Sequence, residues 1–440
     1  MTQTPTEALS PVAAPAPPRR ETGYAAGGSE VTSWWNTLSE ERTPELRWPY
    51  CLDVYDDMMT DPQVFSVLRA VMMPILGTTW RLDGTGCTDD VIRHCSNDLG
   101  LPVVGEGDDI VNTDAPAEER FSWSEHLEVA LEEELGYGHS YHEQSAYWGD
   151  DGRWHLRKLG WRPPRSIAKF NVARDGGLVS IEQKPMNNTG GVLTAAGTKN
   201  IPIPIGRLVA YVHRRKGANW TGRSLLRPAY GPWLLNNRAK RVEMIYAERH
   251  ASPLVTYTDS ENGTPQTLAD GEDVAKRVRS GDEAGAALPY GAKLELQGAT
   301  GTLPDIGKIK TYNDDLIGRV VLAHFLNLGQ AAGTGSYALG VTFQDFFTLG
   351  LQAEAELVRR VASRHIVRDL VTWTWGPAVR APKLVFDEIG SRKDSIVHAI
   401  AALVSAGVLQ PDEDLEKFTR LALGLPPRGA GAPVLPGTAA

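Results

Sequence analysis

Apolar residues recur at helical spacing in separate parts of the chain. Residues 56–77 carry them at every third or fourth position, and Asp61, which precedes a proline, is the expected N-cap. Residues 123–138 carry a leucine stripe between an expected cap at Ser124 and an expected stop at Gly138. These patterns predict two amphipathic helices in the first third of the chain.

The second half of the chain contains three longer helical patterns. They cover residues 222–250, 306–328 and 341–370. An acidic, glycine-rich insert, residues 251–305, separates the first two. A Gly/Ala/Ser-rich segment, residues 329–340, precedes the third. Two helices around an insert, followed by a flexible loop and another helix, are more typical of a mechanical part than of a catalytic pocket.

Alternating apolar and polar residues replace the helical pattern between residues 139 and 213. Glycine- and aspartate-rich turns at 149–152 and 175–177 divide this block into two expected hairpins. Further short elements are expected as helices over 90–101 and 391–426, and as strands over 78–84, around Trp373 and Trp375, and over 382–389. The fold class is therefore expected to be α+β, with the strands clustered together.

Both ends of the chain have a composition that does not support a packed core. Residues 1–49 are rich in Pro, Ala, Thr and Glu, and residues 427–440 in Gly, Pro and Ala. Such segments bury too little apolar surface to offset their ordering entropy. We expect a mobile arm, with Trp34 and Trp35 as anchors for a partner, and a disordered tail.

Composition excludes several classes of function. The formal net charge is −9, which disfavours tight nonspecific DNA binding, because that affinity comes from neutralising phosphates. No apolar run approaches the roughly 18 residues of a membrane span, and no secretory signal begins the chain. Cys51, Cys87 and Cys95 form no CxxC pair, which favours a reduced, intracellular protein.

No residue pattern supports catalysis, a cofactor or a metal. His139 and His142 are near one another, but in a strand they point to opposite faces, so a structural role is expected. Residues 333–336 lack the spacing and the preceding strand of a phosphate-binding loop. The adjacent acidic pairs, such as Asp314 and Asp315, are expected to be solvated surface. A soluble nuclease or hydrolase with a hidden site stays an alternative.

The stretch from Gly222 to Leu254 carries a resemblance to a known family. It resembles the segment of tailed-bacteriophage portal proteins in which a Gly-x-Ser turn begins a long helix, which then ends in a glycine- and proline-containing turn. Ala251 stands where that family usually has glycine. Residues 61–84 are similar to the family's opening helix and strand, and residues 382–426 to its C-terminal part in the branch of Mu-type and long-tailed phages. The order of these segments, over about residues 50–426, carries the resemblance.

The resemblance implies an architecture of named parts. They are a flexible arm (1–49), an α+β wing (50–221), two stem helices (222–250 and 306–328), a small α/β clip (251–305), a tunnel loop (329–340), a long wing helix with closing strands (341–390), a helical crown (391–426) and a tail (427–440).

The resemblance also implies a function without catalysis or cofactor. Portal proteins form a ring, usually of twelve subunits, at one capsid vertex of the virion, after assembly in the host cytoplasm. Double-stranded DNA passes through the ring during packaging and ejection. The implied partners are further copies of the chain, the major capsid protein, a head–tail adaptor and the terminase large subunit. A portal-like connector of a gene-transfer particle is the neighbouring alternative.

Candidate functional residues follow from these segments. The uncharged tunnel loop can touch DNA transiently without gripping phosphate, through Gln330, Thr334, Ser336 and Tyr337. The basic stem candidates are Arg227, Arg238, Lys240, Arg241, Lys308 and Lys310. The candidates for contacts of the clip with neighbouring subunits or an adaptor are Asp270, Glu272, Asp273, Lys276, Arg277 and Arg279. The expected clip strands, 254–258 and 292–298, can add to a neighbour's sheet edge.

Overall fold

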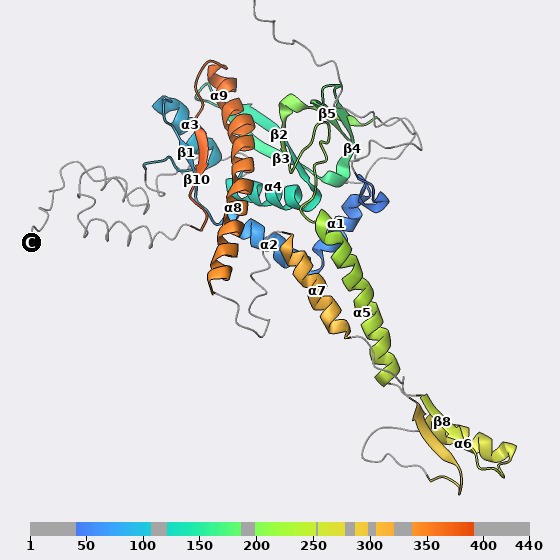
Figure 1. The fold of residues 1–440 in the computed structure, drawn as a ribbon. Helices are drawn as coiled ribbons and strands as arrows, with labels where there is room; N and C mark the ends of the chain where they lie inside the picture. The colour runs from blue at the N-terminus through green and yellow to red at the C-terminus, as the bar shows by residue number, and fades with distance from the viewer. Residues whose placement is uncertain are drawn as a thin grey trace, which may run out of the picture. The chain divides into compact units, whose positions relative to one another are not determined.

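The computed structural model describes residues 41–106, 121–185, 199–251, 254–277, 287–297, 305–320 and 337–390 (Figure 1). Its α-helices are α1 (Cys51–Met59), α2 (Pro62–Leu76), α3 (Asp89–Leu99), α4 (Trp123–Tyr137), α5 (Tyr230–Ala251), α6 (Pro265–Arg277), α7 (Ile306–Arg319), α8 (Tyr337–Ala362) and α9 (Arg368–Trp375). Its strands are β1 (Trp80–Asp83), β2 (His139–Trp148), β3 (Trp154–Arg162), β4 (Ile167–Val172), β5 (Leu178–Gln183), β6 (Ile201–Pro204), β7 (Leu208–Val212), β8 (Leu254–Thr258), β9 (Lys293–Gln297) and β10 (Lys383–Phe386).

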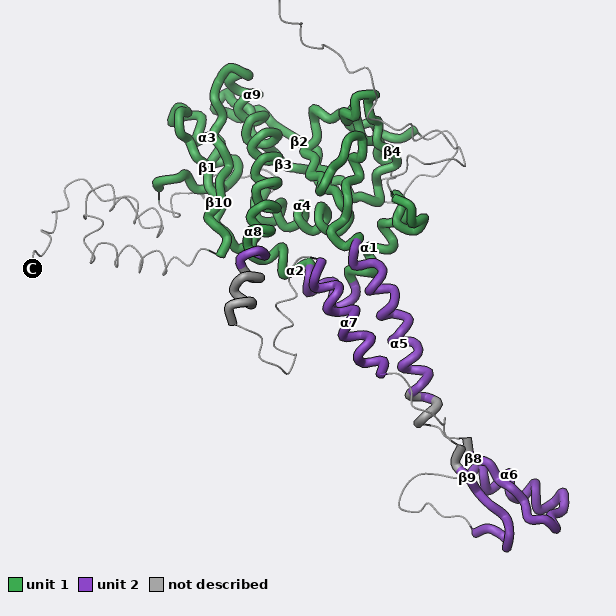
Figure 2. Tube along the Cα trace, in the orientation of Figure 1, with its two compact units in different colours: residues 1–59, 68–227, 348–440 green, residues 60–67, 228–347 purple. Residues whose placement is uncertain are grey.

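The chain divides into two compact units (Figure 2). Unit 1 comprises Met1–Met59, Leu68–Arg227 and Thr348–Ala440, and unit 2 comprises Thr60–Val67 and Pro228–Phe347. The mixture of helices and strands confirms the predicted α+β class. The expected crown and tail, and residues 1–40 of the expected arm, lie outside the described residues.

In the described part of unit 1, the strands form three small antiparallel sheets. Strands β3, β2 and β7 form one, in that order, and β4, β5 and β6 form another. The two predicted hairpins are confirmed, since the turns at 149–152 and 175–177 connect β2 to β3 and β4 to β5. The third sheet pairs β1 with β10, with Trp80 opposite Phe386. Buried side chains of the first two sheets, including Tyr141, Ile181 and Leu208, form a common core.

Side chains at the start of two helices satisfy backbone N–H groups that have no partner within the helix. Asp61 Oδ1 accepts hydrogen bonds from the N–H groups of Gln63 (3.0 Å) and Val64 (3.4 Å), so the predicted N-cap of α2 is confirmed. The predicted cap of α4 is wrong by two residues. Ser122, with an extended backbone, accepts from the N–H of Glu125 (3.4 Å), and Ser124 lies inside the first turn. Gly138, at φ 98°, ends α4 as predicted.

The C-terminal helical region differs from the prediction. Helix α8 continues through a π-helical segment, Ser363–Val367, into α9, so Trp373 and Trp375 are helical and the strand predicted for them is wrong. The alternation of Trp and Thr there imitates a strand. However, Leu370 and Val371 are buried at helical positions, and Gly376, at φ 83°, ends the helix.

Glycines permit a close crossing of three chain segments in unit 1. Gly138 and Gly222 both have positive φ angles, 98° and 65°. A Cβ on Gly222 would lie 2.0 Å from the carbonyl oxygen of Gly138 and 2.9 Å from that of His213. The N–H of His213 donates to Gly138 O (2.9 Å), and the N–H of Arg223 donates to His213 O (2.9 Å). The crossing therefore holds the chain in place just before α5 begins.

We expect Gly222→Ala to destabilise unit 1 by at least about 3 kcal/mol, because the methyl group meets backbone oxygens at a left-handed φ. Urea unfolding monitored by tryptophan fluorescence measures this. Gly206→Ala is the control, since a Cβ there meets nothing within 4 Å. Equal stability of the two variants would contradict the close contact between Gly222 and the carbonyl oxygen of Gly138.

A second buried feature is the carboxyl group of Glu133 on α4. It accepts hydrogen bonds from Ser140 Oγ (2.8 Å) and Trp161 Nε1 (2.6 Å). The side chain is only 5% exposed. Burial raises the pKa of Glu133 to about 7, although the two hydrogen bonds oppose the shift. The folded protein therefore holds this proton more tightly than the unfolded chain.

The pKa of Glu133 is higher in the folded protein than in the unfolded chain. Its contribution to the free energy of unfolding is therefore complete at acidic pH and declines as pH rises towards 7. We expect the stability of the wild type relative to Glu133→Gln to fall by roughly 3 kcal/mol between pH 4 and pH 8. Denaturant unfolding at several pH values tests this. Glu132→Gln, at an exposed neighbouring position, should show no such slope. A pH-independent difference for Glu133→Gln would refute the raised pKa.

Candidate stem, clip and tunnel-loop segments

Helices α5 and α7 lie side by side and run in opposite directions (Figure 1). Asn236 Nδ2 donates to Asp314 Oδ1 (2.6 Å), and Lys310 Nζ lies 2.9 Å from Glu243 Oε2. The higher number on α5 pairs with the lower number on α7, which fixes the antiparallel register. Polar side chains thus hold together the two helices expected as the stem.

The polar contacts in unit 2 continue to the segment before α2. Lys240 Nζ lies 2.8 Å from Asp61 Oδ2, the other oxygen of the α2 cap. Asn236 is buried, and burial raises the pKa of Asp314 while its hydrogen bond from Asn236 opposes that shift. A pair with one buried member tolerates little displacement, because losing one partner leaves the other unsatisfied.

The opposite side of α5 carries exposed apolar residues. Leu235, Val242 and Ile245 are 52%, 55% and 50% exposed. Steps of seven and three residues place them on one face of a helix, and Arg238 and Arg241 share that face by the same rule. Half-exposed aliphatic residues at regular spacing mark a surface that another protein surface can cover. We refer to these five residues as the outer face of α5.

The six predicted stem residues differ in their exposure and in their ion pairs. Arg238 and Arg241 are exposed on the outer face, whereas Lys240 and Lys310 are engaged in ion pairs within unit 2. The side chain of Lys308 is 86% exposed, 3.6 Å from Asp305 in the first turn of α7.

Arg227 does not belong to the helix that was predicted over 222–250. Pro228 follows it, and α5 begins only at Tyr230, because residues 222–229 form the glycine crossing and a short 3₁₀ turn. Two nitrogens of Arg227 lie 2.6 and 2.9 Å from the carboxylate oxygens of Glu41. Burial alone would raise the pKa of Glu41, but the hydrogen bonds and charge of Arg227 hold it below its usual value. This pair lies in unit 1.

The expected tunnel loop falls mostly outside the described residues. Gln330, Thr334 and Ser336 lie there, as do residues 321–328 of the second predicted stem helix. Tyr337 is the first residue of α8, which therefore begins four residues before the predicted start at 341.

The insert contains a small α/β group. Strands β8 and β9 coincide with the two predicted strands and pair with each other, with Thr256 opposite Glu295. Helix α6, which the sequence did not predict, packs on β8. A Cβ on the buried Gly271 would lie 2.1 Å from the Tyr257 ring, so the absence of a side chain permits the helix to approach the strand. In the described part of unit 2, no further strand covers the outer edges of this sheet.

Five of the six predicted clip charges, those of Asp270, Glu272, Asp273, Lys276 and Arg277, lie on α6 and partly pair with each other. Glu272 and Lys276 are 2.6 Å apart, and Asp273 and Arg277 are 3.4 Å apart, both one helical turn in sequence. Asp270 accepts from Gln266 (3.2 Å). Arg279 is outside the described residues. Exposed pairs of this kind add little stability and remain accessible to a partner.

The histidines considered as metal ligands are structural. His139 and His142 are buried on opposite faces of β2. His139 Nδ1 lies 2.8 Å from Thr221 O, and His142 Nε2 lies 2.9 Å from Ser140 Oγ. The sequence analysis missed a different group, His94, Asp151 and His155, which the fold brings together. Its members are up to 61 residues apart and match no spacing motif.

Comparison with known proteins identifies the family of this chain. The family model described as the portal protein of Mu bacteriophage matches residues 52–421. No curated protein matches the chain in sequence. Among described helices, none has the length and hydropathy needed to cross a bilayer.

Solved structures share the fold at low sequence identity. A chain from the virion of a native gene transfer agent (GTA) particle matches with a TM-score of 0.56 and 13% identity, covering 86% of this chain and 94% of that one. A chain from the neck of a native GTA particle, computed with C12 symmetry, matches with a TM-score of 0.55 and 13% identity, covering 86% and 94%. A chain from the neck of an empty GTA particle, computed with C6 symmetry, gives 0.54 and 14%, covering 84% and 92%.

The family model spans most of the chain, from the residue after the start of α1 into the expected crown. It therefore agrees with the order of segments that first suggested the resemblance. The chain belongs to the Mu-type family of bacteriophage portal proteins.

Proposed function

We propose that this protein forms the ring-shaped channel at one capsid vertex through which double-stranded DNA is packaged and ejected. The match to the portal family over residues 52–421 carries this proposal. The ring closes by repeating one heterologous contact, and we expect about twelve copies in it. A match to a chain from a particle neck that was computed with C12 symmetry supports that number.

Within this ring, α5 and α7 form the stem and β8, β9 and α6 form the clip. The outer face of α5 packs against a neighbouring copy, because Leu235, Val242 and Ile245 expose apolar surface in the single chain. The open edges of β8 and β9 suit strand addition between neighbouring clips. The exposed charges of α6 suit contacts with an adaptor or neighbour. We assign residues 391–426 to the crown and expect the arm, residues 1–49, to reach a partner in the shell or ring.

The protein acts as a conduit and docking platform without catalysis of its own. ATP hydrolysis belongs to a separate terminase motor, and the ring is the docking site for the terminase large subunit and for a head–tail adaptor. The ring assembles in the host cytoplasm with the major capsid protein. An acidic chain with an uncharged tunnel loop supports weak contact with moving DNA, because tight phosphate binding would stall translocation.

A connector in a gene-transfer particle is the second candidate. The matches to chains of GTA particles favour it. At identities of 13–14%, these matches show a shared fold. The two roles share one mechanism and differ in the particle's contents. Sequencing the DNA inside purified particles separates them, since a phage packages its own genome and a transfer agent packages host fragments.

The outer face of α5 gives a direct test of ring assembly. We expect the double substitution Val242→Asp and Ile245→Asp to abolish rings and leave subunits or small oligomers, because two carboxylates would be buried in an apolar contact. Mass photometry of the purified full-length protein measures the change.

Val179→Asp is the matched control, since Val179 on β5 is 54% exposed and lies in unit 1. It should assemble like the wild type. If the double variant also formed rings as readily as the wild type, the outer face of α5 would not be a subunit contact.

A second test concerns the tunnel loop. A photo-crosslinking amino acid at Tyr337, which lies in the predicted tunnel loop and is the first residue of α8, should cross-link to DNA in particles arrested during packaging. The same group at Tyr50, 67% exposed in unit 1, should cross-link much less. Strong DNA cross-links from stem positions together with none from position 337 would remove the loop from the channel wall.

A further inference from the structure

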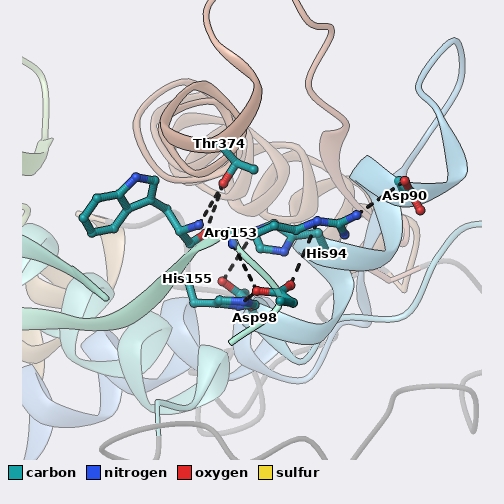
Figure 3. Close-up of polar contacts among 8 residues, drawn as sticks. Asp90, His94, Asp98, Arg153, His155 and Thr374 are labelled. Atoms are coloured by element: carbon teal, nitrogen blue, oxygen red, sulfur yellow. Dashed lines mark hydrogen bonds and ion pairs between the residues drawn. The ribbon is translucent and has the colours of Figure 1, made fainter. Parts of the chain in front are cut away.

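Unit 1 contains a cluster of histidines and carboxylates that has no role in the proposed channel. His94 and Asp98 lie one turn apart on α3, Asp151 lies in the turn between β2 and β3, and His155 is the second residue of β3. Figure 3 shows His94, Asp98 and His155 converging beneath Thr374 of α9. Three segments of unit 1 thus contribute to one polar group.

The distances within the cluster are close to those of a metal site. One ligand atom from each of His94, Asp151 and His155 lies within 4.8 Å of the others. His155 Nε2 and Asp151 Oδ1 are 3.0 Å apart, and the centroids of the two imidazole rings are 4.7 Å apart. Ligands around tetrahedral zinc are separated by about 3.4 Å, given bond lengths of about 2.0–2.1 Å. Small side-chain rotations therefore bring the three ligand atoms onto one ion.

Asp98 prepares His155 to act as a ligand. Its Oδ1 lies 2.7 Å from His155 Nδ1, and its Oδ2 accepts the N–H of Leu156 (2.8 Å). The Asp98 side chain is only 7% exposed, so its position is fixed on both sides. A carboxylate that holds one imidazole nitrogen as N–H leaves the other nitrogen free for a metal, an arrangement common in zinc proteins.

Gly149 lies against the side chains of Asp151 and His155. A Cβ on Gly149 would lie 2.8 Å from both Asp151 Oδ1 and His155 Nε2, so glycine keeps a side chain out of this space. Arg153 is the neighbouring cation: its guanidinium lies 3.4 Å from Asp90, stacks over the Trp375 ring and is 4.0 Å from Asp151 Oδ2. Its backbone N–H donates to Asp151 Oδ1 (3.1 Å), which orients that carboxylate. Asp151 is 45% exposed, which opens the site to solvent.

We propose that His94, Asp151 and His155 bind a divalent transition-metal ion, with zinc as the best chemical match, and that Asp98 is a positioning residue for His155. Two imidazole nitrogens and one carboxylate oxygen suit zinc, nickel or copper, whereas magnesium and calcium require oxygen ligands. Water would complete the coordination at the exposed side.

Binding would have defined chemical and structural consequences. In the metal-free protein, Asp98 and Asp151 both face nitrogens of His155. The ion would replace the proton on Nε2, so zinc binding would release a proton and would weaken as pH falls. His94 Nε2, which lies 3.0 Å from Trp154 O, would exchange that contact for the ion. The bound ion would connect α3 to the β2–β3 turn and stabilise unit 1 without taking part in DNA passage.

Isothermal titration of untagged, full-length, assembled protein with zinc chloride tests the proposal. We expect about one ion per chain, and at least about tenfold weaker binding in Asp151→Asn and His155→Gln. Asp150→Asn, at the exposed neighbouring position, should bind like the wild type. Gly149→Ala should also weaken binding, because its methyl group would occupy the space beside the ligands.

Cobalt(II) provides an independent readout that does not depend on stability. The wild type should give the intense visible absorption of four-coordinate cobalt, and Asp151→Asn should lose it. Asp98→Asn should keep the stoichiometry but weaken binding by about tenfold or more, as expected of a positioning residue. Zinc binding that Asp151→Asn and His155→Gln leave unchanged, or a cobalt spectrum of the hydrated ion alone, would overturn the proposal. The cluster would then be a protonated His155 held between two carboxylates.

Discussion

The crossing of backbone at Gly138, His213 and Gly222 is the constraint on which much of unit 1 depends. The chain leaves the sheet after β7, turns, and passes close to the start of β2 before it continues into α5. Buried histidines complete the crossing: His139 faces the carbonyl of Thr221 at 2.8 Å, and His213 that of Arg223 at 2.7 Å. Burial lowers the pKa of His139 to about 4, so it serves as a neutral hydrogen-bonding group rather than a charge.

Polar contacts also connect the helices α5 and α7 of unit 2. Asn236, Asp314 and the Lys310–Glu243 pair connect α5 to α7, while much of the apolar surface of α5 remains exposed on its outer face. A self-sufficient helical hairpin buries its apolar side between its own helices, whereas Leu235, Val242 and Ile245 of α5 are half exposed. This exposure is expected of a subunit whose missing core is supplied by another copy.

Local patterns in the sequence were enough to predict elements whose periodicity is strong. Examples are α2 with its Asp61 cap, the two hairpins and the strands β8 and β9. The start of α5 was placed too early because the pairing of Gly222 with Gly138 depends on tertiary contact, which propensity does not contain. Trp373 and Trp375 were wrongly predicted as a strand because only three residues alternate there. The burial of Leu370 and Val371 on one side of a helix decides the structure of this segment.

Contacts between segments that are far apart in the chain could not be predicted from the sequence, for the same reason. Pairing of β1 with β10 joins segments about 300 residues apart, as the register of Trp80 and Phe386 requires. The grouping of His94, Asp151 and His155 likewise depends on how α3 packs beside the β2–β3 turn. Stem and clip residues were predicted through the resemblance to a family, whereas their individual partners, such as Asp61 for Lys240, emerged only from the fold.

Single-particle electron microscopy of the purified full-length protein tests the central claim most directly. We expect closed rings of about twelve subunits around a channel, with Leu235, Val242 and Ile245 of each subunit covered by its neighbour. A uniform monomer across salt and protein concentration, or a ring in which these three residues stay exposed to solvent, would contradict the account.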